Sequence, residues 1–89
     1  MVFTDRDRIA VLADNLRRAM AKQKMSQEQL ESESGVSQAT ISRILNAKHD
    51  PASTVVWRLA QALETSMDKL FEQPTKKFFR ARLDRTIQV

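Results

Sequence analysis

Apolar residues recur at intervals of three and four from Ile9 to Phe71, which is the spacing of one face of an α-helix. Polar breaks divide this pattern into five stretches, and only two prolines occur in the chain. The pattern therefore predicts five helices and an all-α fold. The apolar positions that we expect to face the core are Ile9, Leu12, Leu16, Ala19, Met20, Leu30, Ile41, Ile44, Leu45, Val56, Leu59, Ala60, Leu63, Met67, Leu70 and Phe71.

Residues that cap helices stand at the start of each stretch. Thr4 precedes the first, Ser66 precedes the fifth, and Ser53 or Thr54 can cap the fourth. A side-chain oxygen at this position accepts a hydrogen bond from a backbone N–H of the first turn. These residues predict where the first, fourth and fifth helices begin.

The stretch from Ser26 to Leu45 predicts two helices joined by a tight turn. Ser26 can cap a helix, and Gln29 three residues later completes a capping box. Gly35, the only glycine in the chain, can adopt the left-handed backbone that ends this helix. Ser37 then offers a second cap two residues later. Two helices joined in this way form a helix-turn-helix.

The periodicity changes after Pro74, where apolar and polar residues alternate as in a strand. A helix also fits, because three of the apolar residues are spaced by four, and a disordered arm is a third reading. A lone strand would pair with the same strand of a second copy. We therefore predict a domain over residues 1–73 and an extension over 74–89 that is a dimerisation strand or an arm. The alternating apolar residues are Phe79, Ala81, Leu83, Ile87 and Val89.

The net positive charge lies at the C-terminal end of the chain. The net charge is +4 and the sequence pI is about 10.0. Residues 1–73 contain ten basic and ten acidic residues, whereas residues 74–89 contain five basic residues and one acidic residue. The whole excess is in the extension, which points to an anionic partner.

Several classes of protein find no support in the composition. The chain has no cysteine and no long apolar run, so we expect a soluble, cytoplasmic protein. His49 is the only histidine and has no second histidine or cysteine with which to share a metal ion. A glycine-rich phosphate loop and a catalytic set of ligands are also absent from the sequence. We therefore predict no enzymatic activity, no metal and no cofactor.

The segment Met25 to Arg43 resembles the helix-turn-helix of the λ-repressor/Cro-like family, the XRE-type regulators of bacteria and phages. The resemblance rests on Met25-Ser26-Gln27-Glu28, Leu30, Gly35-Val36-Ser37 and Thr40-Ile41-Ser42-Arg43. It extends over about Asp5 to Phe71. It implies a five-helix λ-repressor-like DNA-binding domain whose second and third helices form the motif.

Two departures from the family pattern concern the first helix. Lys24 stands where relatives often have glycine at the end of this helix, so it must either turn differently or adopt a positive φ at a cost of roughly 1 kcal/mol. Met20 stands where many relatives carry an arginine that binds phosphate. We expect Arg17 or Lys24 to make that contact here.

Other departures concern packing. Glu31 and Ser34 replace residues that are usually apolar in the second helix. Because a buried unpaired carboxylate is costly, we expect Glu31 to turn toward solvent or to meet Arg43 or Arg58. Trp57 lies beside the apolar face of the fourth helix, where it either covers the rim of the core or anchors a partner.

Docking of such a motif places the N-terminal part of the third helix in the major groove of DNA. Gln38 can bond to adenine N6 and N7, and Ala39 or the Thr40 methyl group can contact a thymine methyl group. Arg43 can reach guanine or a phosphate. The resemblance implies that Gln27 binds a phosphate and braces Gln38. The predicted DNA-binding residues are Gln27, Ser37, Gln38, Ala39, Thr40, Ser42, Arg43, Asn46 and Lys48.

The sequence thus predicts a sequence-specific regulator of transcription that binds double-stranded DNA. We expect a repressor of phage, toxin–antitoxin or restriction-control type that binds a pseudo-palindromic operator as a homodimer. The alternative is a protein-interaction module with the same fold, such as an antitoxin whose extension binds a toxin. The two functions are compatible, because an antitoxin can regulate its own gene.

Overall fold

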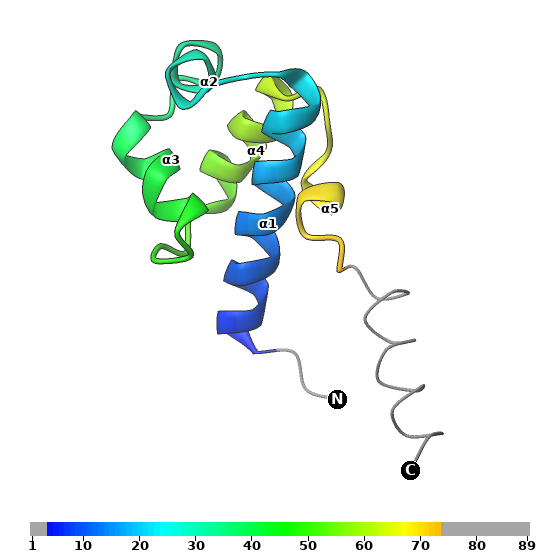
Figure 1. Ribbon diagram of the computed structural model, residues 1–89. Helices are drawn as coiled ribbons and strands as arrows, with labels where there is room; N and C mark the ends of the chain where they lie inside the picture. Colours follow the sequence, from blue (N-terminus) through cyan, green and yellow to red (C-terminus); the bar gives the residue numbers. More distant parts are fainter. Residues whose placement is uncertain (1–3, 74–89) are drawn as a thin grey trace.

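The computed structural model describes residues 4–73, so the predicted strand or arm lies outside the described residues, as do residues 1–3. The described part is all helical (Figure 1). It confirms the predicted five-helix, all-α fold, whereas the domain boundary at residue 73 stays a prediction. The helices are α1 (Asp5–Gln23), α2 (Gln27–Ser34), α3 (Gln38–Leu45), α4 (Ser53–Ala62) and α5 (Met67–Leu70).

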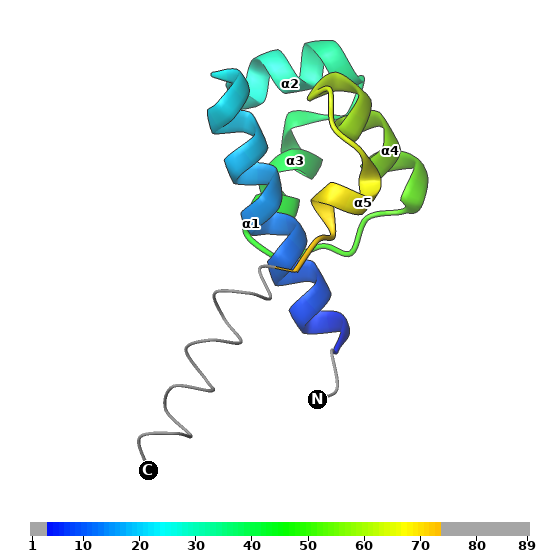
Figure 2. The same ribbon diagram turned by 90° about the vertical axis from the view of Figure 1, so that its right-hand side faces the viewer.

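The long helix α1 packs against α3 and α5, which lie on either side of it in Figure 1. In Figure 2, α1 lies along one edge of the helical domain. Side chains from all five helices meet in a single apolar core, together with Val36 from the turn between α2 and α3. Most predicted core positions are confirmed, and Val36 is an addition. The buried core residues are Leu12, Leu16, Met20, Leu30, Val36, Ile41, Ile44, Val56, Leu59, Ala60, Leu63 and Leu70.

Four of the helices begin at the predicted caps. Thr4 and Ser26 each form a full capping box, the second with Gln29. Ser37 and Ser66 each accept a hydrogen bond from the N–H group three residues later. Each cap satisfies a backbone donor that the helix itself leaves without a partner.

The cap predicted for α4 is wrong. This helix begins at Ser53, so the N-cap is Ala52, which has no side chain able to cap. The backbone of Ala52, which follows the buried Pro51, is extended (φ −62°, ψ 152°). Ser53 and Thr54 therefore already lie inside the first turn, where a side chain cannot act as the N-cap.

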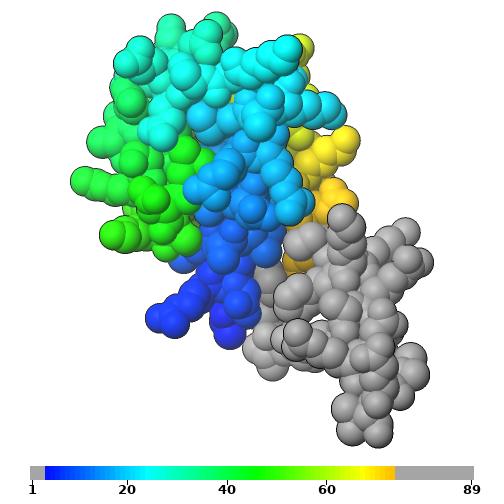
Figure 3. Space-filling view, viewed as in Figure 1, coloured from blue at the N-terminus to red at the C-terminus, as the bar shows by residue number. Residues whose placement is uncertain are grey.

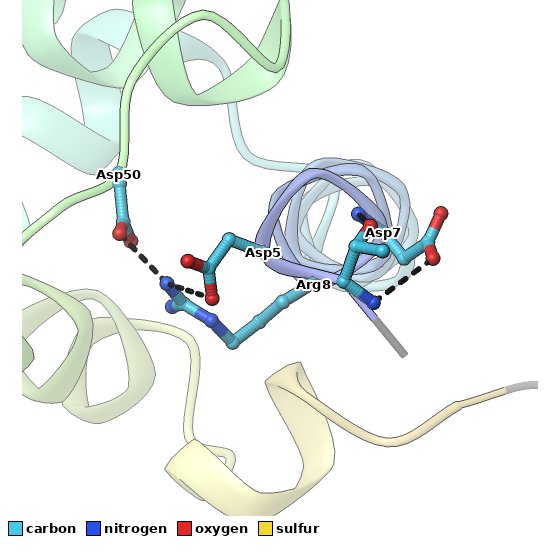
Figure 4. A network of polar contacts seen from close by, with 5 residues as sticks. Asp5, Asp7, Arg8 and Asp50 are labelled. Carbon is cyan, nitrogen blue, oxygen red and sulfur yellow. Dashed lines mark hydrogen bonds and ion pairs between the residues drawn. The ribbon is translucent and has the colours of Figure 1, made fainter. Parts of the chain in front are cut away.

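The N-terminal half of α1 joins two distant parts of the chain. Arg8 forms an ion pair with Asp50 of the α3–α4 loop at 2.7 Å and a longer one with Asp5 at 3.9 Å (Figure 4). The Arg8 guanidinium also lies 5.9 Å from the centre of the Phe71 ring, within the range of a cation–π contact. The hydrogen bond from Arg8 lowers the pKa of Asp50 and raises the pKa of Arg8 itself.

A side chain of α1 bonds to the last carbonyl group of α5 and to one just after this helix. Asn15 Nδ2 donates to the carbonyl oxygens of Leu70 and Glu72, at 2.8 Å each. Since the last carbonyls of a helix have no partner within it, Asn15 satisfies groups that would otherwise need water. Over residues 4–73, none of the helices combines the length and apolar character needed to span a membrane.

Candidate nucleic-acid interface

The turn between α2 and α3 has the predicted geometry. Gly35 ends α2 in the left-handed conformation (φ 78°, ψ 6°), and its N–H donates to the carbonyl oxygen of Glu31 at 2.8 Å. A Cβ atom built on Gly35 would meet nothing within 4 Å. Backbone conformation rather than space is therefore the reason for glycine here.

The N-terminus of α3 is closed by two side chains. Ser37 Oγ accepts from the Thr40 N–H at 3.2 Å and donates to Thr40 Oγ1 at 2.8 Å. Glu31 Oε2 accepts from the N–H of Gln38, the first residue of α3, at 2.9 Å. This bond ties the start of α3 to α2.

The predicted environment of Glu31 is therefore wrong in part. Glu31 is half-buried, and its partner is a backbone N–H rather than Arg43 or Arg58. The ion pairs found within residues 4–73 do not include it. The packing of α2 against α3 brings this carboxylate to the positive end of the α3 dipole, which stabilises a negative charge.

A side chain of α1 bonds to the C-terminus of α3. Arg17 Nη2 donates to the carbonyl oxygen of Leu45 at 3.0 Å, and Asn46 Nδ2 donates to that of Ser42 at 2.9 Å. A cation at this end of a helix also complements the dipole. Helix α3 thus has a carboxylate from α2 at one end and a guanidinium from α1 at the other. The predicted phosphate contact by Arg17 stays a prediction.

The inner face of α3 is buried and its outer face is open. Ile41 and Ile44 are both 0% exposed, as predicted. Helix α3 lies at one flank of the molecule, where its side chains reach the surface (Figure 3). The predicted DNA-binding residues are all on the surface, exposed at Ser37, Gln38, Ala39, Arg43, Asn46 and Lys48 and half-buried at Gln27, Thr40 and Ser42.

Two other predicted features can be placed. Lys24 does adopt the left-handed conformation (φ 54°, ψ 43°) at the end of α1, as one of the two predicted readings required. Trp57 leaves 54% of its surface exposed and so covers the core only in part. Within residues 4–73, acidic, histidine and cysteine side chains do not gather in a group that could hold a metal ion.

Sequence reasoning missed the roles of Arg8, Arg17 and Glu31 in holding elements together. Each joins residues on different helices or loops. In the sequence, Arg8 and Arg17 look like charged residues on solvated helix faces. Only Glu31 gave a signal in the sequence, because a carboxylate at a usually apolar position of the motif needs a partner.

Comparison with known families decides the class of this domain. Residues 16–70, more than half of the chain, match the model of the HTH_3 helix-turn-helix family. The chain belongs to the HTH_3 family. This confirms the resemblance to XRE-type DNA-binding regulators. No curated protein matches the sequence of the chain.

Solved structures with the same fold include regulators of transcription. An HTH_3 family transcriptional regulator from Vibrio cholerae is 25% identical, with a TM-score of 0.73 over 76% of this chain and 38% of its own. This HTH_3 chain thus spans less than half of that regulator. A hypothetical transcription factor, NHTF, from Neisseria is 25% identical, with a TM-score of 0.75 over 88% of this chain and 91% of its own.

A third structure shares the fold at lower identity. The restriction-modification controller protein C.AhdI from Aeromonas hydrophila is 22% identical, with a TM-score of 0.68 over 71% of this chain and 96% of its own. At this identity, the similarity shows that the HTH_3 fold is shared and nothing more.

Proposed function

We propose that this HTH_3 chain is a sequence-specific regulator of transcription that reads double-stranded DNA with α3. The observation that supports the proposal is that burial of one face of α3 fixes the orientation of this helix about its own axis. Ile41 and Ile44 are fully buried, while Gln38, Ala39 and Arg43 are exposed. A helix held in this way can present the same side chains to every site it meets, which is what base recognition requires.

Each exposed position of α3 has a chemistry suited to DNA. The Gln38 amide both donates and accepts, which matches the N6 and N7 edge of adenine. Ala39 and the methyl group of Thr40 suit the thymine methyl group, and Arg43 suits guanine or a phosphate. The other polar residues of the interface are assigned to phosphates, which set the position of the protein rather than the sequence it reads. They are Gln27, Ser37, Ser42, Asn46 and Lys48.

A comparison of two glutamine variants tests this assignment. A preferred site is first selected from random duplex DNA, and binding of Gln38→Ala is then measured by gel shift. We expect a loss of roughly 1 to 3 kcal/mol on that site and a relaxed choice at one base pair. Gln61→Ala, which removes an exposed glutamine from α4, is the matched control and should bind like the parent. Equal binding by both variants would contradict the role of α3.

We further propose that the regulator is a repressor that acts as a homodimer. One recognition helix reads only a few base pairs, so a specific site calls for two of them about 34 Å apart on a pseudo-palindrome. The alternating apolar residues of the extension 74–89 suit pairing of two copies, and its five basic residues suit DNA.

Removal of residues 76–89 tests the dimer. Sedimentation of the truncated protein should show a monomer, whereas the full chain should be a dimer. If the truncated protein stays dimeric but loses DNA affinity and salt dependence, the extension is a basic arm instead. Footprinting of the full chain should protect two half-sites, and one asymmetric half-site would speak against the dimer.

A further inference from the structure

The N-terminus of a helix is normally a place where phosphates bind, because its first N–H groups point outward and its dipole is positive there. In α3 the first and third of these N–H groups already have partners. The Gln38 N–H donates to Glu31 Oε2 at 2.9 Å, and the Thr40 N–H donates to Ser37 Oγ at 3.2 Å. This end of α3 is therefore unlike an open phosphate site.

The charge of the partner distinguishes α3 from α2. The start of α2 is closed by neutral groups of its own segment, the Ser26 hydroxyl and the Gln29 amide. The start of α3 is closed in part by a carboxylate that comes from the preceding helix. A negative charge in this place repels the phosphates of DNA in addition to occupying a donor.

We propose that Glu31 is a specificity-determining residue of the DNA interface. Its carboxylate occupies the first N–H group of α3 and repels phosphates from it, so that contacts at this N–H give way to those of the Gln38 side chain with the base edges it meets. Binding to random DNA, which depends on phosphates, is thereby weakened more than binding to the preferred site. The inference rests on the proposed function, since it assumes that α3 enters the major groove.

Two substitutions separate the charge of Glu31 from its hydrogen bond. Glu31→Gln keeps an oxygen that can accept from the Gln38 N–H but removes the charge. Glu31→Ala removes both and frees the N–H for a phosphate. We expect both variants to bind random-sequence duplex DNA more tightly, by roughly three- to tenfold at 0.1 M salt, with the larger gain for Glu31→Ala. The ratio of specific to random binding should fall accordingly.

Salt dependence gives a readout that a purely structural role would not change. Loss of the Glu31 charge together with a phosphate contact by the freed N–H should steepen the plot of log affinity against log salt for Glu31→Ala on random DNA, by at most about 0.9. Glu33→Ala is the matched control, because it removes the same charge from an exposed position of α2. It should leave both the slope and the specificity ratio close to those of the parent.

Two results would overturn the inference alone. The Glu31 variants could match Glu33→Ala in both the salt slope and the specificity ratio, so that any loss of negative charge has the same effect. Glu31→Ala could instead weaken specific and random binding in the same proportion, which would make Glu31 a structural residue.

A third result would overturn the proposed function as well, namely a parent protein that binds neither duplex. Thermal melts by circular dichroism identify any loss of folding in the variants. If Glu31→Ala does not fold, Glu31→Gln still tests the inference.

Discussion

The two turns that flank α2 have the same backbone design but different residues. Each consists of a left-handed residue, an apolar residue and a serine that caps the next helix. Lys24 (φ 54°) leads to Ser26 in the first turn, and Gly35 (φ 78°) leads to Ser37 in the second. The same connection is thus built once with glycine and once without it. The first turn holds a non-glycine residue in a conformation that glycine adopts without strain.

The turns differ in how the next helix is closed. Helix α2 begins with a capping box made within its own first turn. Helix α3 begins with the Ser37 cap and with Glu31 from the preceding helix. The start of α2 is therefore a local structure, whereas the start of α3 also depends on the packing of α2 against α3.

The largest effect on stability should come from a substitution in the buried face of α2, the helix between the two turns. Leu30 is the buried residue of α2 and is 0% exposed. Leu30→Ala should lower the free energy of unfolding by about 3 kcal/mol, because it removes buried contacts and leaves a cavity. Urea unfolding measures the change. Leu30→Met, which preserves most of the volume, should cost less than about 1.5 kcal/mol, and an equal loss in both variants would contradict this role.

Exchanging residues at the left-handed positions should give opposite results in the two turns. Gly35→Ala should destabilise the domain by about 1 to 2 kcal/mol, since its Cβ meets no atoms and only backbone strain is added. Lys24→Gly should stabilise it by up to about 1 kcal/mol by relieving the same strain. Thermal unfolding of both variants shows whether each is more or less stable than the parent. The same sign in both would show that strain at a positive φ does not set the stability of these turns.

Serine substitutions should separate true caps from neighbouring serines. Ser26→Ala should cost about 1 kcal/mol, because it leaves a helix N–H without its partner. Ser53→Ala should change stability by less than about 0.5 kcal/mol, because Ser53 is not the cap of α4. Ala52→Ser, which supplies the missing cap, should raise stability by roughly 0.5 to 1 kcal/mol. Urea unfolding compares the three, and a large loss for Ser53→Ala would contradict the observed start of α4.

The smallest effect should come from the α3–α4 connection, which Arg8 holds by an ion pair with Asp50. The Arg8 hydrogen bond lowers the pKa of Asp50, so the stabilising contribution is present above the ordinary aspartate pKa of about 4. It is lost as the pH falls through the lowered pKa of the folded state. Asp50→Asn should therefore lower the melting temperature slightly at about pH 6, and this difference should shrink as the pH falls below about 4. A difference that does not shrink would have another cause.

Much of the fold and of the candidate site could be predicted because the signals are local. The spacing of Ile41 and Ile44 shows which face of α3 is buried, and this leaves Gln38 and Arg43 on the outer face. The start of α4 could not be predicted in the same way. The side chains of Ser53 and Thr54 favour those two positions, but the extended backbone of Ala52 makes Ala52 the N-cap, although it has no capping side chain.

The sequence by itself determined the number of helices, the apolar face of each, the Gly35 turn and four caps. These depend on hydrogen bonds between residues three apart and on a period of 3.6, which neighbouring residues encode. Only the tertiary structure decided the partners of Glu31, Arg17 and Arg8. Those contacts join residues 7, 28 and 42 positions apart, so each forms only when the helices pack against one another. The charge of Glu31 could be read from the chain, but its place at the start of α3 required the fold.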